Sequence, residues 1–105
     1  MDEWEILEYL KGFTPLRAEI FYWRFIEKLT NREVGEKVSR NPESLGYHFR
    51  EIRRELKQKF DKEDIDSQVI YLFGTMAVTP PPFTSWPPEG YVFPEQPHET
   101  QQPEP

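Results

Sequence analysis

Basic residues concentrate in one stretch of the chain, residues 50–59. The stretch contains the cations Arg50, Arg53, Arg54, Lys57 and Lys59, against two carboxylates, Glu51 and Glu55. A guanidinium can donate two hydrogen bonds to the edge of a guanine or hold a phosphate, and an ammonium can hold a phosphate. The chemistry open to this stretch is therefore recognition of a polyanion.

A helix predicted over residues 42–60 positions these cations. Asn41 can accept from the free N–H groups of a first turn, and Pro42 fits the first helical position. Apolar residues then recur at steps of four, three and four, at Leu45, Phe49, Ile52 and Leu56. This spacing places them on one face, which we expect to point inward, with the basic residues outward.

A shorter helical pattern precedes this helix, with Val34 and Val38 as its apolar residues. Thr30 or Asn31 can cap its start. Gly35 falls where this helix must pass closest to its partner, and a glycine allows the approach at a propensity cost of about 1 kcal/mol relative to Ala. Since only residues 39–41 separate the two patterns, we predict a helix-turn-helix over residues 29–60.

Two further helices are predicted before this pair. The first has Trp4, Ile6, Leu7 and Leu10 as its apolar residues, Asp2 and Glu5 as a capping box and Gly12 as its end. The second starts at Thr14 and Pro15 and is apolar around much of its circumference from Leu16 to Ile26. We expect the second to be the core helix of a small all-α bundle.

One more helix is predicted between Phe60 and Gly74. Ile65, Val69 and Leu72 share a face, Asp61 or Asp64 can cap the helix, and Gly74 can end it. The run VIYLF, residues 69–73, is also typical of a strand, but a lone strand would have no partner. The helical domain is accordingly placed at residues 1–74.

Residues 75–105 are predicted to form a proline-rich acidic tail. Nine of the eleven prolines lie in residues 79–105, which favours a flexible, extended polyproline conformation. Large apolar residues are unusual in such a segment, and this one contains Phe83, Trp86, Tyr91 and Phe93. These four either bind a partner or fold back on the domain.

The net charge of -6 is unevenly distributed. Residues 11–60 hold 12 Lys and Arg against 7 Asp and Glu, whereas residues 61–105 hold 1 against 8. A local basic face on an acidic chain is compatible with phosphate binding. There is no cysteine and no apolar run of about 20 residues, so we expect a cytoplasmic protein without membrane contact.

No arrangement of residues predicts an enzyme. The carboxylates do not accompany a nucleophile or a glycine-rich loop, and we expect no cofactor. His98 has no companion for a metal site, and His48 falls between exposed and inward positions.

Residues 14–60 resemble the fourth conserved region of bacterial sigma factors. The resemblance rests on Pro15, Glu19, Ile20, Phe21 and Arg24, on Leu29, Thr30, Glu33, Val34 and Gly35, and on the apolar positions of the following helix. It implies a helix-turn-helix that binds promoter DNA and contacts RNA polymerase. The chain has no segment able to melt a promoter, Gly46 replaces a side chain in the recognition helix, and the tail is foreign to the pattern. A stand-alone sigma-like regulator of a phage or mobile element fits these departures.

Carried onto this sequence, the resemblance assigns two sets of DNA contacts. The residues expected at base edges are Glu43, Ser44, Tyr47 and Arg50, and those expected at phosphates are Arg32, Arg40, Arg53, Arg54 and Lys57. The alternative is a solvated helix face with ion pairs such as Glu51–Arg54 and Glu55–Lys59.

We therefore predict a sequence-specific transcriptional regulator that binds double-stranded DNA. One alternative is a protein-interaction module that binds RNA polymerase or a sigma factor. Another is a phage packaging subunit that recognises DNA as a ring. The oligomeric state is left open.

Overall fold

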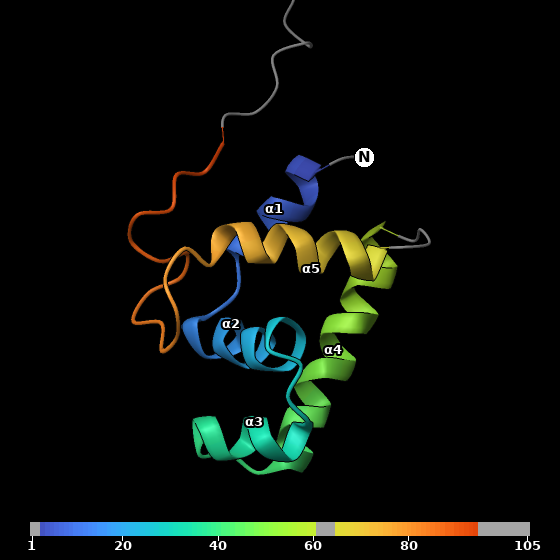
Figure 1. Ribbon diagram of the computed structural model, residues 1–105. Coiled ribbons are helices and arrows are strands. Elements are labelled where there is room, and N and C mark those ends of the chain that lie inside the picture. The colour runs from blue at the N-terminus through green and yellow to red at the C-terminus, as the bar shows by residue number, and fades with distance from the viewer. Residues whose placement is uncertain (1–2, 61–64, 95–105) are drawn as a thin grey trace, which may run out of the picture.

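The computed structural model describes residues 3–60 and 65–94, and in this part of the chain all regular structure is helical (Figure 1). The elements are α1 Glu3–Lys11, α2 Pro15–Phe21, the π-helical segment η1 Tyr22–Ile26, α3 Asn31–Val38, α4 Pro42–Phe60 and α5 Ile65–Met76. The all-α prediction is confirmed, and α5 forms where a strand was the alternative. Within the described ranges, no helix combines the length and apolarity needed to cross a membrane.

Three helices begin where the sequence provides a cap. Thr14 and Thr30 each accept a hydrogen bond from the backbone N–H three residues later, and Thr30 completes a capping box with Glu33. Asn41 Oδ1 accepts from the N–H of Glu43 at 2.7 Å. These acceptors satisfy N–H groups that a helix start leaves free. Other predicted caps lie outside the described residues: Asp2, Asp61 and Asp64.

The hydrophobic core lies on two sides of α2. Its larger part joins α1, α2, α4 and α5, and its smaller part joins α2 to α3 and to the first half of α4. Figure 1 shows α2 between α5 and α3, with α4 running along their ends. Of the four residues predicted to face inward from α4, three are buried and Phe49 is partly buried against both parts of the core.

The predicted core helix changes pitch after Phe21. Glu27 N donates to Tyr22 O at 3.1 Å, which is the five-residue spacing of a π-helix. No residue of η1 is fully buried, and Lys28 then takes a left-handed φ of 63° before α3. Full burial is thus limited to the α-helical part of the predicted segment.

The chain after α5 packs against the helices. We name residues 79–94 the proline-rich strap. Its Phe83 is only 7% exposed. Trp86 stacks on Phe73 with ring centroids 4.8 Å apart, and its Nε1 donates to the Leu10 carbonyl at 2.9 Å. In Figure 1 the strap descends from the end of α5 towards α2 and then returns towards α1.

The prediction of a flexible tail does not describe this part of the chain. Phe93 lies edge-on to Trp4 with ring centroids 4.8 Å apart, and Lys11 Nζ lies 4.6 Å from the centre of the Phe93 ring. Tyr91 is also partly buried against the core. The four aromatic residues predicted to bind a partner thus fold back on the domain, which was the alternative. Residues 95–105 lie outside the described part.

The predicted end of the last helix at Gly74 needs correction. α5 runs through Gly74 to Met76. Phe73 and Met76, on either side, have no exposed surface. Their burial outweighs the helix-propensity cost of the glycine, which is about 1 kcal/mol.

Candidate nucleic-acid interface

α3 and α4 are joined by a tight turn that depends on a glycine. Ser39 takes a left-handed φ of 58°, and Arg40 N donates to Gly35 O at 2.9 Å. A Cβ atom on Gly35 would lie 2.6 Å from the Arg40 carbonyl oxygen and 3.5 Å from Pro42 of α4. Only glycine allows this approach, so the close contact predicted at Gly35 is confirmed.

Two side-chain contacts fix α3 on η1. Lys37 Nζ lies 4.7 Å from the centre of a Trp23 ring, a cation–π contact. Arg24 Nε donates to Asn31 Oδ1 at 3.0 Å. Since the two contacts hold opposite ends of α3, its orientation on the bundle is set by polar contacts as well as by Val34.

The carboxylate of Glu55 fixes α4 on the first two helices. Tyr9 Oη donates to Glu55 Oε1 at 2.8 Å, and Arg17 Nη1 lies 3.4 Å from the same oxygen. Burial and this hydrogen bond raise the pKa of the Tyr9 hydroxyl. The predicted Glu55–Lys59 pair is therefore wrong. Local spacing could not indicate the contacts that Glu55 makes instead, because Tyr9 and Arg17 lie 46 and 38 residues away in the sequence.

The solvent-facing side of α4 presents all four residues predicted to contact bases. Glu43, Ser44, Tyr47 and Arg50 are all exposed, and Tyr47 is 55% exposed. No described part of the strap covers them. This arrangement leaves the first half of α4 open to a partner.

The residues predicted to contact phosphates are also exposed: Arg32, Arg40, Arg53, Arg54 and Lys57. The predicted Glu51–Arg54 ion pair is confirmed. Its hydrogen bond lowers the pKa of Glu51 and raises that of Arg54. Among the described residues, no carboxylate lies within ion-pair distance of Arg50, Arg53 or Lys57.

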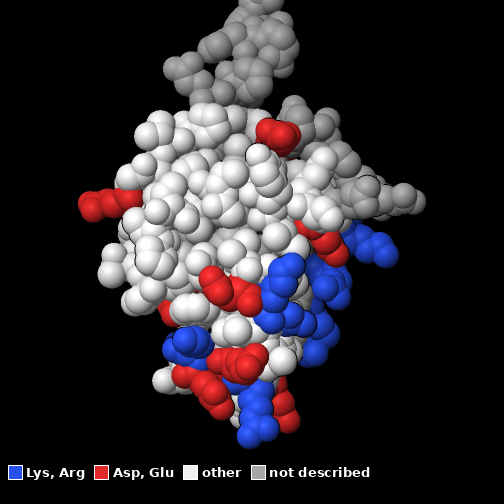
Figure 2. Space-filling view, viewed as in Figure 1, with Lys and Arg blue, Asp and Glu red and all other residues white. Residues whose placement is uncertain are grey.

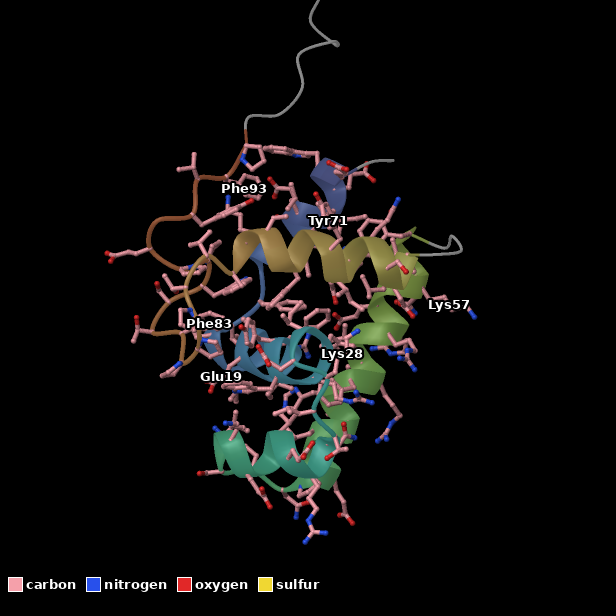
Figure 3. All side chains as sticks on the ribbon, viewed as in Figure 1. Glu19, Lys28, Lys57, Tyr71, Phe83 and Phe93 are labelled. Carbon is pink, nitrogen blue, oxygen red and sulfur yellow. The ribbon has the colours of Figure 1, made fainter. Side chains whose placement is uncertain are left out.

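On the visible face, most charged side chains lie over α3 and α4. Figure 2 shows basic side chains gathered along α4, with acidic ones interspersed towards α3. Figure 3 shows Lys57 pointing away from the bundle. The cationic part of this surface is thus the outer side of α4 from Arg50 onward, and it can hold several phosphates.

A small apolar cavity lies where α2, η1, α4 and α5 meet. It measures about 80 Å³, and its polar border consists of Arg53 and Asp66. In residues 3–60 and 65–94, no three metal-ligating side chains lie together. The cavity and the exposed side of α4 share one residue, Arg53.

His48 of α4 is expected to make the stability of the fold depend on pH. Its Nδ1 is buried without a hydrogen-bond partner among the described residues, and burial, followed by the charges of Arg17 and Arg40, lowers its pKa. The unfolded chain therefore takes up the proton first, so stability is lost as pH falls below the ordinary value of 6.5. Urea unfolding at about pH 7.5 and about pH 5.5 should show a smaller loss for His48→Gln than for the parent chain. Equal losses would contradict this assignment.

No protein-family model, curated protein or solved structure matches this chain.

Proposed function

We propose that this chain is a sequence-specific DNA-binding transcriptional regulator in which α3 and α4 form a helix-turn-helix. The observation that carries the proposal is the outer side of α4. Tyr47 and Arg50 are exposed there, and cations continue along the same helix to Lys57. In this motif the second helix enters the major groove with its first half at the base edges.

The geometry around α4 supports this assignment. The turn at Gly35 is tight, and Glu55 is drawn away from the outer side by Tyr9 and Arg17. Within α4, the carboxylate left near the cations that follow Arg50 is that of Glu51, which pairs with Arg54. A phosphate could replace Glu51 as the partner of Arg54 at little cost, because exposed ion pairs contribute about 0 to 1 kcal/mol.

The two kinds of contact have different expected roles. Arg50 can donate twice to a guanine, so it would select sequence. Arg53 and Lys57 would hold phosphates, which fixes the register of the helix without selecting sequence. Residues 14–60 would then act in the cytoplasm like the sigma-factor region that they resemble.

Selection from random duplexes, followed by gel-shift titration, tests the proposal. Arg50→Ala should weaken binding to the selected duplex by about 5- to 150-fold, since a bidentate contact discriminates by about 1–3 kcal/mol. Arg53→Ala should weaken binding to all duplexes alike and reduce the salt slope by about 1. The two variants thereby separate reading of bases from holding of phosphates.

Lys11→Ala is the matched control. It removes the same charge from α1, which is not part of the α3–α4 pair. We expect unchanged DNA affinity for this variant. If no duplex is enriched, or if Arg50→Ala and Lys11→Ala behave alike on every duplex, the DNA-binding proposal fails.

A further inference from the structure

The cavity between α2, η1, α4 and α5 has an interior of one chemical kind. Seven of its nine lining residues are apolar, and three of these are phenylalanines. A buried water needs about two to four polar partners, so this interior is a poor site for water. The cavity is therefore suited to an apolar group.

The walls of the cavity come from four elements, so its shape depends on the tertiary fold. Phe21 belongs to α2, Phe25 to η1, Phe49 to α4 and Val69 to α5. The rings of Phe25 and Phe49 meet edge-on, with centroids 5.7 Å apart. Phe25 lies in the π-helical segment, and such segments occur frequently at functional sites. The change of helical pitch and the cavity thus fall at the same place.

The two remaining lining residues have opposite charges. Arg53 and Asp66 are both exposed, whereas the apolar lining residues are buried or partly buried. Among the described residues, neither of these two charges lies within ion-pair distance of an opposite charge. A ligand at this place can therefore offer a carboxylate to Arg53 and an ammonium group to Asp66.

The volume limits the apolar part of such a ligand. The cavity measures about 80 Å³. A cavity of about 150 Å³ holds a benzene ring, so one of about half that volume holds roughly three or four carbon atoms. A short branched aliphatic group such as isopropyl fits this limit, and an indole ring exceeds it.

We propose that the cavity binds a free α-amino acid with a short, branched aliphatic side chain, of the size of valine. The side chain enters the apolar interior, the carboxylate binds Arg53 and the ammonium group binds Asp66. Each part of this ligand class matches one feature of the site: its volume, its cation and its anion. The site does not require that the chain bind DNA.

Arg53 connects this site to the exposed side of α4. Under the proposed function, on which this step rests, Arg53 holds a phosphate of the DNA. A bound amino acid engages the same guanidinium through its carboxylate, so the DNA loses one phosphate contact. Since phosphate contacts do not select sequence, the amino acid acts as an effector that weakens binding to all duplexes alike.

Titration of the full chain with L-valine, without DNA and followed by NMR, tests the site. The methyl signals of the lining residues Ile52, Val69 and Ile70 should shift and reach saturation. Glycine has the same two charges but no side chain, so it should bind at least about tenfold more weakly. Tryptophan should give no saturable shift, because its side chain exceeds the cavity. Equal effects of glycine and valine, or no saturation with valine, would overturn the proposal.

Three variants test the charged part of the site. Arg53→Gln and Asp66→Asn should each raise the dissociation constant for valine by at least about tenfold. Both residues are exposed, so neither change should unfold the chain. Lys59→Gln removes an exposed cation of the same helix that does not line the cavity, and it should leave the constant unchanged. If Arg53→Gln and Asp66→Asn bind valine as the parent chain does, the proposed ligand class is wrong.

Gel-shift titration with and without saturating L-valine tests the effector role. Valine should weaken DNA binding of the parent chain by about the factor that Arg53→Ala produces, and it should not weaken binding of Arg53→Ala further. If valine occupies the cavity and DNA affinity stays the same, the effector role is wrong. A chain that binds valine but no duplex would refute the proposed function and leave the amino-acid site standing, so the two failures are distinguishable.

Discussion

Trp86→Ala is expected to lower the free energy of unfolding by about 3 kcal/mol, the lower end of the range for large aromatic residues. The change removes the stack on Phe73 and the hydrogen bond to the Leu10 carbonyl. It also opens the contact with Phe83 in the strap, where ring centroids are 4.9 Å apart. Urea unfolding followed by far-ultraviolet circular dichroism measures the loss, because the helices report it without depending on tryptophan fluorescence.

Two control variants separate the causes. Trp86→Phe keeps an aromatic ring but removes the N–H donor, so it should cost about 1 kcal/mol for the hydrogen bond. Thr84→Ala changes an exposed residue of the same strap and should have little effect. If Trp86→Ala were as mild as Thr84→Ala, the strap would not be part of the core.

This expectation affects how a deletion of the strap can be used. A chain that ends at Val78 loses Phe83 and Trp86 together, and both pack against the larger part of the core. Such a deletion could be used to test the alternative that the chain binds RNA polymerase. A loss of binding would then have two causes that the deletion cannot separate, unfolding of the domain and removal of a partner site. The helices and the strap have to be tested as one unit.

Gly35→Ala is expected to destabilise the fold by about 2 kcal/mol, as overpacking typically does. The new Cβ would lie 2.6 Å from the Arg40 carbonyl oxygen. Because this atom belongs to the backbone, the turn between α3 and α4 has to shift. The free-energy cost of moving the turn should exceed the helix-propensity gain of about 1 kcal/mol from replacing glycine. Urea unfolding at neutral pH measures the difference.

Gly46→Ala is the matched control on the next helix. Its Cβ would meet only Arg50 Nη1, at 3.6 Å, and that flexible side chain can move. We expect this variant to gain up to about 1 kcal/mol from helix propensity. The two identical substitutions should thus have opposite signs, and an equal gain from both would show that the turn does not need a glycine.

The sequence predicted the helices well, because the interactions that define helix caps and helix faces act over a short range. A cap such as Thr30 depends on groups within one turn, and the face formed by Leu45, Ile52 and Leu56 depends on spacing alone. Gly35 was found in the same way, because the short connection between two helices requires a close approach. The exposure of Tyr47 and Arg50 followed from their position opposite that apolar face.

Long-range contacts were not visible in the sequence. The spacing of Glu55 and Lys59 indicated an ion pair on the surface of the helix. The Glu55 carboxylate instead binds Tyr9 and Arg17 from two other helices. The predicted end of α5 at Gly74 was wrong because burial of Phe73 and Met76 outweighs a local helix breaker. In both cases a distant packing partner decided the outcome.

By itself, then, the sequence determined the all-helical class, the caps and the inward and outward sides of α4, because each follows from interactions within about one helical turn. Only the tertiary structure decided the place of the proline-rich strap. Prolines exclude a helix there, but they do not exclude packing. Trp86 contacts both the Leu10 carbonyl at the end of α1 and the Phe73 ring of α5. These two groups lie close together only because α1 and α5 pack against each other.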